Sequence, residues 1–189
     1  MSLPSSFCNE RRLLTGDFIS AEEIRSRVAE IAQEIRTDYD EVDVLLVGVL
    51  KAAVTFMVDL ARELALPLEM DFMAVSSYGP GTESSGVVRI IKDLDVSIEG
   101  RHVLLVEDIV DSGATLRYLE TTLRARRPAS LRVCTLLNKR RHRKVNLDLS
   151  YVGFEIPDCF VVGYGLDYDE QHRNMPGLAL VADGKPTDG

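Results

Sequence analysis

The stretch VLLVEDIVDSGATL, residues 103–116, is the most informative part of this sequence. It starts as an apolar strand, passes through the carboxylates Glu107, Asp108 and Asp111, and ends in small and hydroxylated residues that open a helix. Backbone N–H groups of residues 112–115 at a helix N-terminus suit a phosphate monoester, and a glycine there lets the backbone approach it closely. Glu107 and Asp108 suit two ribose hydroxyls or a divalent cation. We therefore predict a ribose-phosphate site where a buried strand ends.

Strand-to-helix junctions in general offer a plainer interpretation, in which Asp111 and Ser112 only cap the helix. In that interpretation Glu107 and Asp108 are merely solvated. Three acids and a hydroxyl–glycine–small–hydroxyl turn after a buried strand favour the phosphate site instead. The stretch is not a Walker A loop, because no Gly-Lys-Ser/Thr follows, and it does not match GxGxxG.

The sequence on either side alternates between strand and helix patterns. Ser20 followed by Glu23 is a capping-box pattern, and apolar residues at helical spacing then predict a helix over 21–37. Near-continuous apolar runs are typical of strands that are covered on both faces. Two more helices are expected at 51–65 and 116–125, and strands at 42–50, 69–77, 87–92, 102–106, 131–137, 151–155, 160–162 and 178–181. This alternation predicts an α/β fold with a central, mostly parallel sheet flanked by helices.

We expect one main domain within a single globular unit. Residues 38–150 form the expected core. Residues 1–37 and 151–189 are expected to pack on that core as an N-terminal helix and a small hood. Residues 78–86 are polar and contain three glycines and a proline, so they predict a mobile loop.

Composition limits what the chain does. Its 189 residues are 46% hydrophobic, enough to bury a core, which argues against disorder and against small disulfide scaffolds. The net charge of −8 argues against a general nucleic-acid binder, which needs a basic face. Cys8, Cys134 and Cys159 form no CxxC pair, so neither a structural zinc site nor a disulfide framework is expected. No signal peptide or membrane-length apolar stretch is visible, and we expect a cytoplasmic protein without membrane partners.

Residues 106–116 resemble the phosphoribosyl-diphosphate-binding motif of type I phosphoribosyltransferases, and more narrowly that of the hypoxanthine-guanine phosphoribosyltransferases. The resemblance extends over about residues 42–180. Its further anchors are Leu50-Lys51-Ala52-Ala53, Ser77-Tyr78, Leu136-Leu137-Asn138-Lys139-Arg140, and residues 152–158 and 161–168. The resemblance implies the type I phosphoribosyltransferase fold, in which a hood built from both ends of the chain lies over the sheet.

The resemblance also implies roles for the matching side chains. Asp111 is the implied general base at N7 of a purine. Glu107 and Asp108 would hold the ribose hydroxyls and a magnesium ion, and Asp167 would bind a second magnesium ion. Lys139 would donate a hydrogen bond to the 6-oxo group of the purine, although by its pattern alone it is an ordinary exposed lysine.

Other positions are implied to bind the two substrates. They are Lys51, Ala52 and Arg173 for the departing diphosphate, Ser112, Gly113, Ala114 and Thr115 for the 5′-phosphate, Phe160 and Val161 for the purine ring, and Ser77 and Tyr78 before the loop. That loop is implied to close over the site and exclude water. The Leu50–Lys51 peptide is expected to be cis. By pattern alone Phe160 is a core aromatic and Arg173 a surface arginine.

The implied activity is Mg²⁺-dependent transfer of the 5-phosphoribosyl group from 5-phosphoribosyl diphosphate to N9 of hypoxanthine or guanine, giving IMP or GMP. The same resemblance implies a homodimer or homotetramer. One alternative is a xanthine-preferring relative. Another is a non-catalytic regulator of the same fold that binds RNA, although such a protein needs a basic face. A diphosphokinase that makes the phosphoribosyl donor would need a longer chain and an evident ATP site.

Overall fold

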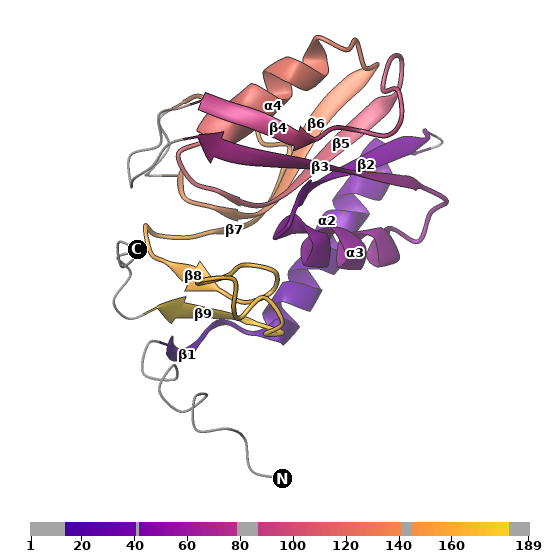
Figure 1. Ribbon diagram of the computed structural model, residues 1–189. Coiled ribbons are helices and arrows are strands. Elements are labelled where there is room, and N and C mark those ends of the chain that lie inside the picture. The colour runs from indigo at the N-terminus through magenta and orange to yellow at the C-terminus, as the bar shows by residue number, and fades with distance from the viewer. Residues whose placement is uncertain (1–13, 41, 79–86, 141–144, 182–189) are drawn as a thin grey trace.

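The main sheet of the computed structural model has six strands in the order β4–β3–β2–β5–β6–β7 (Figure 1). The structure describes residues 14–40, 42–78, 87–140 and 145–181. The strands of this sheet are β2 (Val44–Leu50), β3 (Glu69–Tyr78), β4 (Val87–Lys92), β5 (His102–Val110), β6 (Ser130–Asn138) and β7 (Tyr151–Glu155). Neighbouring strands pair in parallel, except that β4 pairs antiparallel with β3. The predicted, mostly parallel α/β sheet is confirmed.

Helices cover both faces of this sheet. α2 (Ala21–Asp38) and α3 (Ala53–Leu64) pack on one face, and α4 (Ala114–Arg124) packs on the other. Successive residues of β2 point to opposite faces, so that Leu46 joins the α2–α3 side and Leu45 the α4 side. Both side chains are fully buried. This two-sided burial explains why β2 is a near-continuous apolar run.

The two ends of the chain meet in a second, antiparallel sheet with the order β1–β9–β8. Its strands are β1 (Leu14–Ile19), β8 (Val161–Val162) and β9 (Leu178–Val181). Figure 1 shows this sheet beside the main one, below β7. The expected hood is therefore present. From here on, the term "hood" refers to this small sheet and the loops of residues 156–181.

Two expected boundaries differ from the structure. β7 was expected in the hood, but it pairs in parallel with β6 and forms an edge of the main sheet. α2 was expected to pack on the core as a separate N-terminal helix, and it does pack against α3 and β7. Its buried side chains, such as Ile31, belong to the same apolar cluster as those of α3 and β2. Residues 21–38 and 151–155 are therefore part of the core.

The N-terminus of α2 has the predicted capping box. The Ser20 hydroxyl accepts a hydrogen bond from the Glu23 N–H at 3.2 Å, and the Glu23 carboxylate accepts one from the Ser20 N–H at 2.8 Å. These two bonds satisfy backbone donors that a helix start otherwise leaves unpaired.

The remaining expectations concern thiols, the loop and the membrane. Cys134 is buried and Cys159 is partly exposed, and both are free thiols. Cys8 and the loop predicted at 78–86, apart from its first residue, lie outside the described residues. Within the described ranges, no helix is both long enough and apolar enough to cross a membrane.

Candidate active site

The site begins where β5 extends beyond its neighbour β2. Pairing between these two strands ends at Gly48 and Val106, whereas β6 continues to pair with β5 as far as Val110. The strand was expected to end at Val106, and continued pairing with β6 explains its greater length. The last part of β5 therefore has one side open toward the end of β2. Glu107 and Asp108 lie in this part of the strand.

The turn from β5 into α4 leaves the helix N-terminus open to an anion. The N-cap residue is Gly113, with φ 82°, and it has no side chain that could cap the helix. The Ser112 hydroxyl accepts a hydrogen bond from the Ala114 N–H at 3.4 Å. A cavity of about 170 Å³ lies here, and its lining includes Glu107, Asp111 and Thr115. Gly113, rather than Asp111 or Ser112, therefore occupies the N-cap position, although the Ser112 hydroxyl accepts from the first N–H of the helix.

Of the two adjacent acids, Glu107 is buried and Asp108 is partly exposed. Glu107 is buried, with 6% of its surface exposed, and this burial raises its pKa well above the usual range, with a further contribution from the charge of Asp108. Burial also raises the pKa of Asp108 to about 6. The Arg173 guanidinium opposes that rise and the Asp167 carboxylate adds to it, so both hood residues lie near Asp108. The interpretation of Glu107 as a solvated acid is therefore wrong.

The donor set fits magnesium bound together with a substrate. Across the part of the chain that the structure describes, no group of three or more His, Cys, Asp or Glu residues could hold a metal ion by itself. Mg²⁺ usually binds one or two carboxylates and takes its other oxygens from water and substrate phosphates. Glu107 and Asp108 supply such carboxylates, and a cation beside them would favour their charged forms.

Lys139 is buried beside Asp111 at the end of β6. Its N–H donates to the Val110 carbonyl at 2.9 Å, which fixes the backbone against β5. Its ammonium group lies 3.1 Å from Asp111 Oδ2 and 3.4 Å from Asp158 Oδ1. Because only 8% of Lys139 is exposed, the pattern-based interpretation as an exposed lysine is wrong. A buried lysine needs such anionic partners, and its ammonium can donate to a ligand that enters between them.

The turn after β2 carries Lys51 and contacts the hood. The Leu50–Lys51 peptide is cis, as the family resemblance implied. Gly165 of the hood, with φ 100°, lies so close that a Cβ on it would be 2.2 Å from the Ala52 carbonyl oxygen. Arg173 donates to the Gly165 carbonyl at 2.9 Å and lies 2.8 Å from Asp167. The hood therefore holds Arg173 next to the Lys51 turn.

The remaining predicted residues lie on β3 and in the hood. Ser77 and Tyr78 end β3, where they pair with β4. Phe160 is partly buried and contacts the Tyr168 ring edge-on, with centroids 5.7 Å apart. Val161 is buried in β8 and pairs with Leu180 of β9.

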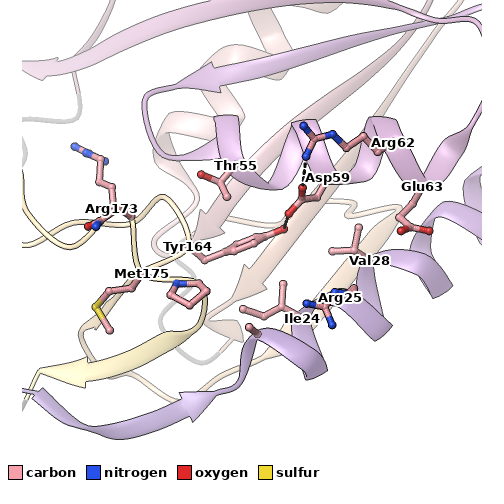
Figure 2. Close-up of a pocket in the computed structure, with 13 residues that line it drawn as sticks. Ile24, Arg25, Val28, Thr55, Asp59, Arg62, Glu63, Tyr164, Arg173 and Met175 are labelled. Carbon is pink, nitrogen blue, oxygen red and sulfur yellow. Dashed lines mark hydrogen bonds and ion pairs between the residues drawn. The ribbon is translucent and has the colours of Figure 1, made fainter.

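A separate hollow of about 460 Å³ lies between α2, α3 and residues 173–176 (Figure 2). In its wall the Tyr164 hydroxyl donates to Asp59 at 2.8 Å. Asp59 also pairs with Arg62 at 3.3 Å. Glu107 and Asp111 line the smaller cavity at Gly113 and not this hollow. The predicted site therefore lies at the smaller cavity.

Comparison with known proteins identifies the family to which this chain belongs. The model of the phosphoribosyl transferase domain matches residues 19–169. The hypoxanthine-guanine phosphoribosyltransferase of Mycobacterium tuberculosis is 55% identical over 169 residues, which cover 86% of this chain and 84% of that protein. The enzyme of the same name from Bacillus subtilis is 52% identical over 163 residues, covering 86% of this chain and 91% of its own. The chain belongs to the hypoxanthine-guanine phosphoribosyltransferase family.

Structural comparison agrees with that membership. A crystal structure of a hypoxanthine phosphoribosyltransferase from Staphylococcus aureus has a TM-score of 0.87 with this chain at 42% identity, covering 95% of this chain and 96% of its own. The phosphoribosyltransferase fold expected from the sequence is confirmed. Members of the hypoxanthine-guanine phosphoribosyltransferase family are purine-salvage enzymes, and this chain is one of them.

Three residues of this phosphoribosyltransferase site were missed in the sequence. Asp158 pairs with Lys139, Gly165 contacts Ala52, and Glu170 pairs with Lys51. Asp158 and Gly165 lie within the stretches that carry the family resemblance, but no role was assigned to either. Nothing in the pattern around Glu170 distinguishes it from an exposed acid.

Proposed function

We propose that this chain transfers the 5-phosphoribosyl group from 5-phosphoribosyl diphosphate to N9 of hypoxanthine or guanine, giving IMP or GMP and diphosphate. The observation that carries the proposal is the ion pair between the buried Lys139 and the partly exposed Asp111, beside the open helix N-terminus at Gly113. This arrangement puts a proton acceptor and a donor for a 6-oxo group next to an anion site. By analogy with its family, we propose that the enzyme is a homodimer or homotetramer.

The donor substrate is bound by three groups of residues in this proposal. Backbone N–H groups of residues 112–115 hold the 5′-phosphate at the helix N-terminus. Glu107 and Asp108 accept hydrogen bonds from the ribose hydroxyls. Lys51 and Arg173 bind the diphosphate and stabilise the negative charge that develops on it as the bond to C1 of the ribose breaks.

The acceptor base is bound at the ends of β5 and β6. Asp111 accepts the N7 proton as N9 becomes nucleophilic, a contribution of about 10²–10⁴-fold. Lys139 donates to the 6-oxo group, which disfavours adenine because adenine has an amino donor at that position. Phe160 stacks on the ring, and the backbone of Val161 contacts its edge.

Magnesium is the proposed cofactor. Glu107 and Asp108 would hold one ion and Asp167 a second. Bound Mg²⁺ supplies positive charge that neutralises the diphosphate leaving group.

A spectrophotometric assay with 5-phosphoribosyl diphosphate, Mg²⁺ and each of hypoxanthine, guanine, xanthine and adenine tests this proposal. We expect turnover of hypoxanthine and guanine that EDTA abolishes. Preference for xanthine would favour the xanthine-preferring alternative. No turnover of any base while nucleotide still binds would favour the regulatory alternative, and retention of RNA at low salt would then support it.

A further inference from the structure

Glu170 of the hood contacts both of the cations that the proposed function assigns to the diphosphate. Its Oε2 atom lies 2.9 Å from Lys51 Nζ and 3.2 Å from Arg173 Nη2. Lys51 follows β2 and Arg173 lies in the hood, so this one oxygen joins two separate parts of the molecule. The hydrogen bond from Lys51 and then that from Arg173 lower the pKa of Glu170. Glu170 is therefore an anion at neutral pH.

A short turn aims the Glu170 side chain at these cations. Asp169 and Glu170 have φ values of 52° and 59°, a backbone conformation that residues other than glycine rarely adopt. The Glu170 N–H donates to Asp167 Oδ2 at 2.9 Å, and Tyr168 and Gln171 exchange backbone hydrogen bonds of 3.2 and 3.0 Å across the turn. These bonds hold the turn in its unusual conformation.

We propose that Glu170 is a positioning residue that pairs with Lys51 and Arg173 before the donor binds and is displaced by the diphosphate of 5-phosphoribosyl diphosphate. This inference rests on the proposed function, which gives those two cations to the diphosphate. Diphosphate oxygens need the same N–H donors that the carboxylate accepts from, so the two anions compete. Glu170 and Lys51 have side chains that are 66% and 67% exposed, so their pair can open into water.

The two cations respond differently when Glu170 leaves. Arg173 keeps its contacts with Asp167 and with the Gly165 carbonyl, so it stays in place. Lys51 has no other ion-pair partner among the described residues, so it becomes free to turn toward the incoming anion. Glu170 therefore lowers the affinity for the donor while it keeps Lys51 beside the site.

The variant Glu170→Gln tests this inference, because it keeps the size of the side chain and removes its charge. We expect the Kd for inorganic diphosphate with Mg²⁺, measured by titration calorimetry, to fall about two- to ten-fold, as for the loss of exposed ion pairs. The KM for 5-phosphoribosyl diphosphate should fall similarly, with the KM for hypoxanthine unchanged. Both effects should shrink at high salt, because salt screens exposed charges.

Glu99→Gln is the matched control. Glu99 pairs with Arg127 at 2.7 Å, and both side chains are exposed, but they lie by the start of β5, away from the site. This control should leave the diphosphate Kd unchanged. Unchanged or weaker diphosphate binding by Glu170→Gln, in a protein that turns over hypoxanthine, would overturn the inference alone. A wild-type protein that neither binds diphosphate nor makes nucleotide would overturn the proposed function as well.

Discussion

At the scale of single residues, the site depends on the ion pair between Asp111 and Lys139. Each residue lies just beyond the end of one of two neighbouring strands, and the side chains meet at 3.1 Å. Asp158 offers the ammonium of Lys139 a second partner at 3.4 Å. A purine that receives a hydrogen bond from Lys139 therefore need not break every ion pair of this buried lysine. In the proposed function, the carboxylate of Asp111 then accepts a hydrogen bond from the ring nitrogen.

The proposed role of Asp111 as the general base predicts the effect of Asp111→Asn. Loss of a general base should lower kcat by about 10²–10⁴-fold. The KM values should change only a few-fold, since the phosphate and ribose contacts remain. Steady-state kinetics with hypoxanthine measures both. Asp148→Asn, at an exposed acid after β6, is the control and should behave as wild type. A variant Asp111→Asn with normal turnover would exclude Asp111 as the base.

The raised pKa of Asp108 predicts a pH-dependent stability. Burial raises this pKa from 3.8 to about 6, so the folded protein binds a proton more tightly than the unfolded chain does. Stability must therefore fall as the pH rises from about 4 to about 6. In metal-free protein, Asp108→Asn should increase the free energy of unfolding by about 1–3 kcal/mol above pH 6. It should give no gain at about pH 4, where the wild-type carboxyl is already protonated.

Urea unfolding at both pH values, in EDTA, measures this difference. Asp148→Asn again serves as the control, and it should leave the stability unchanged at both. Equal stabilities of Asp108→Asn and wild type at neutral pH would show that the charged Asp108 carboxylate does not destabilise the folded protein. If the expected gain in stability is found together with a loss of activity, the acid is kept for function at a cost in stability.

At the scale of elements, the N-terminal cap of α2 is the local feature that the sequence predicts most directly. Ser20→Ala removes the hydroxyl that accepts from the Glu23 N–H, and we expect a loss of about 1 kcal/mol in the free energy of unfolding. Ser26→Ala, at an exposed position within the same helix, is the control. Chemical denaturation of the two variants measures the difference. Equal stabilities would mean that packing of the apolar face alone fixes the start of α2.

The inner strands β2, β5 and β6 could be predicted because burial on both faces gives them continuous apolar runs. The edge strands β4 and β7 are only partly buried. The expected bounds of β4 and β7 agree with the structure. β1 was missed, because Gly16 and Asp17 interrupt its pattern and its pairing with β9 has register shifts on both sides of Asp17. The partner of β1 lies at the other end of the chain. A local pattern cannot show such a pairing.

The same distinction applies to the site. Lys51 and Lys139 could be named from the sequence only through the family resemblance, whereas Asp111 also stood out by its place after a buried strand. All three directly follow strands of the main sheet, and parallel strands end at one edge of a sheet. Glu170 could not be named, because its partner Lys51 is 119 positions away and meets it only after the hood folds back. Whether Asp158 reaches Lys139 likewise depends on the path of the loop between β7 and β8.

At the scale of the whole molecule, the hood is attached to the core beside the site. Tyr164 donates to Asp59 of α3, and the adjacent Gly165 packs against the Ala52 carbonyl. Arg173 and Asp167, on the same hood loop, lie close enough to Asp108 of β5 to affect its pKa. The position of this loop relative to the Lys51 turn therefore sets the width of the proposed diphosphate site.

Gly165→Ala tests whether the close approach of hood and core matters for the donor. A Cβ would lie 2.2 Å from the Ala52 carbonyl oxygen, and alanine is disfavoured at φ +100°, so the loop must move away from Lys51. We expect a loss of about 2–4 kcal/mol in the free energy of unfolding, from backbone strain and overpacking together. The KM for 5-phosphoribosyl diphosphate should rise more than the KM for hypoxanthine, because Lys51 and Arg173 are then further apart.

Gly100→Ala separates backbone strain from displacement of the hood. Gly100 also has a positive φ, +71°, but a Cβ there would meet nothing within 4 Å, and the residue lies just before β5, away from the site. This control should lose about 1–2 kcal/mol in stability, as expected for a non-glycine residue in this conformation, and keep both KM values. If Gly165→Ala lost no more stability than Gly100→Ala and kept its KM for the donor, contact with Ala52 would not determine the diphosphate site. A selective rise in that KM would instead show that the close approach of Gly165 to Ala52 positions the hood residues that bind diphosphate.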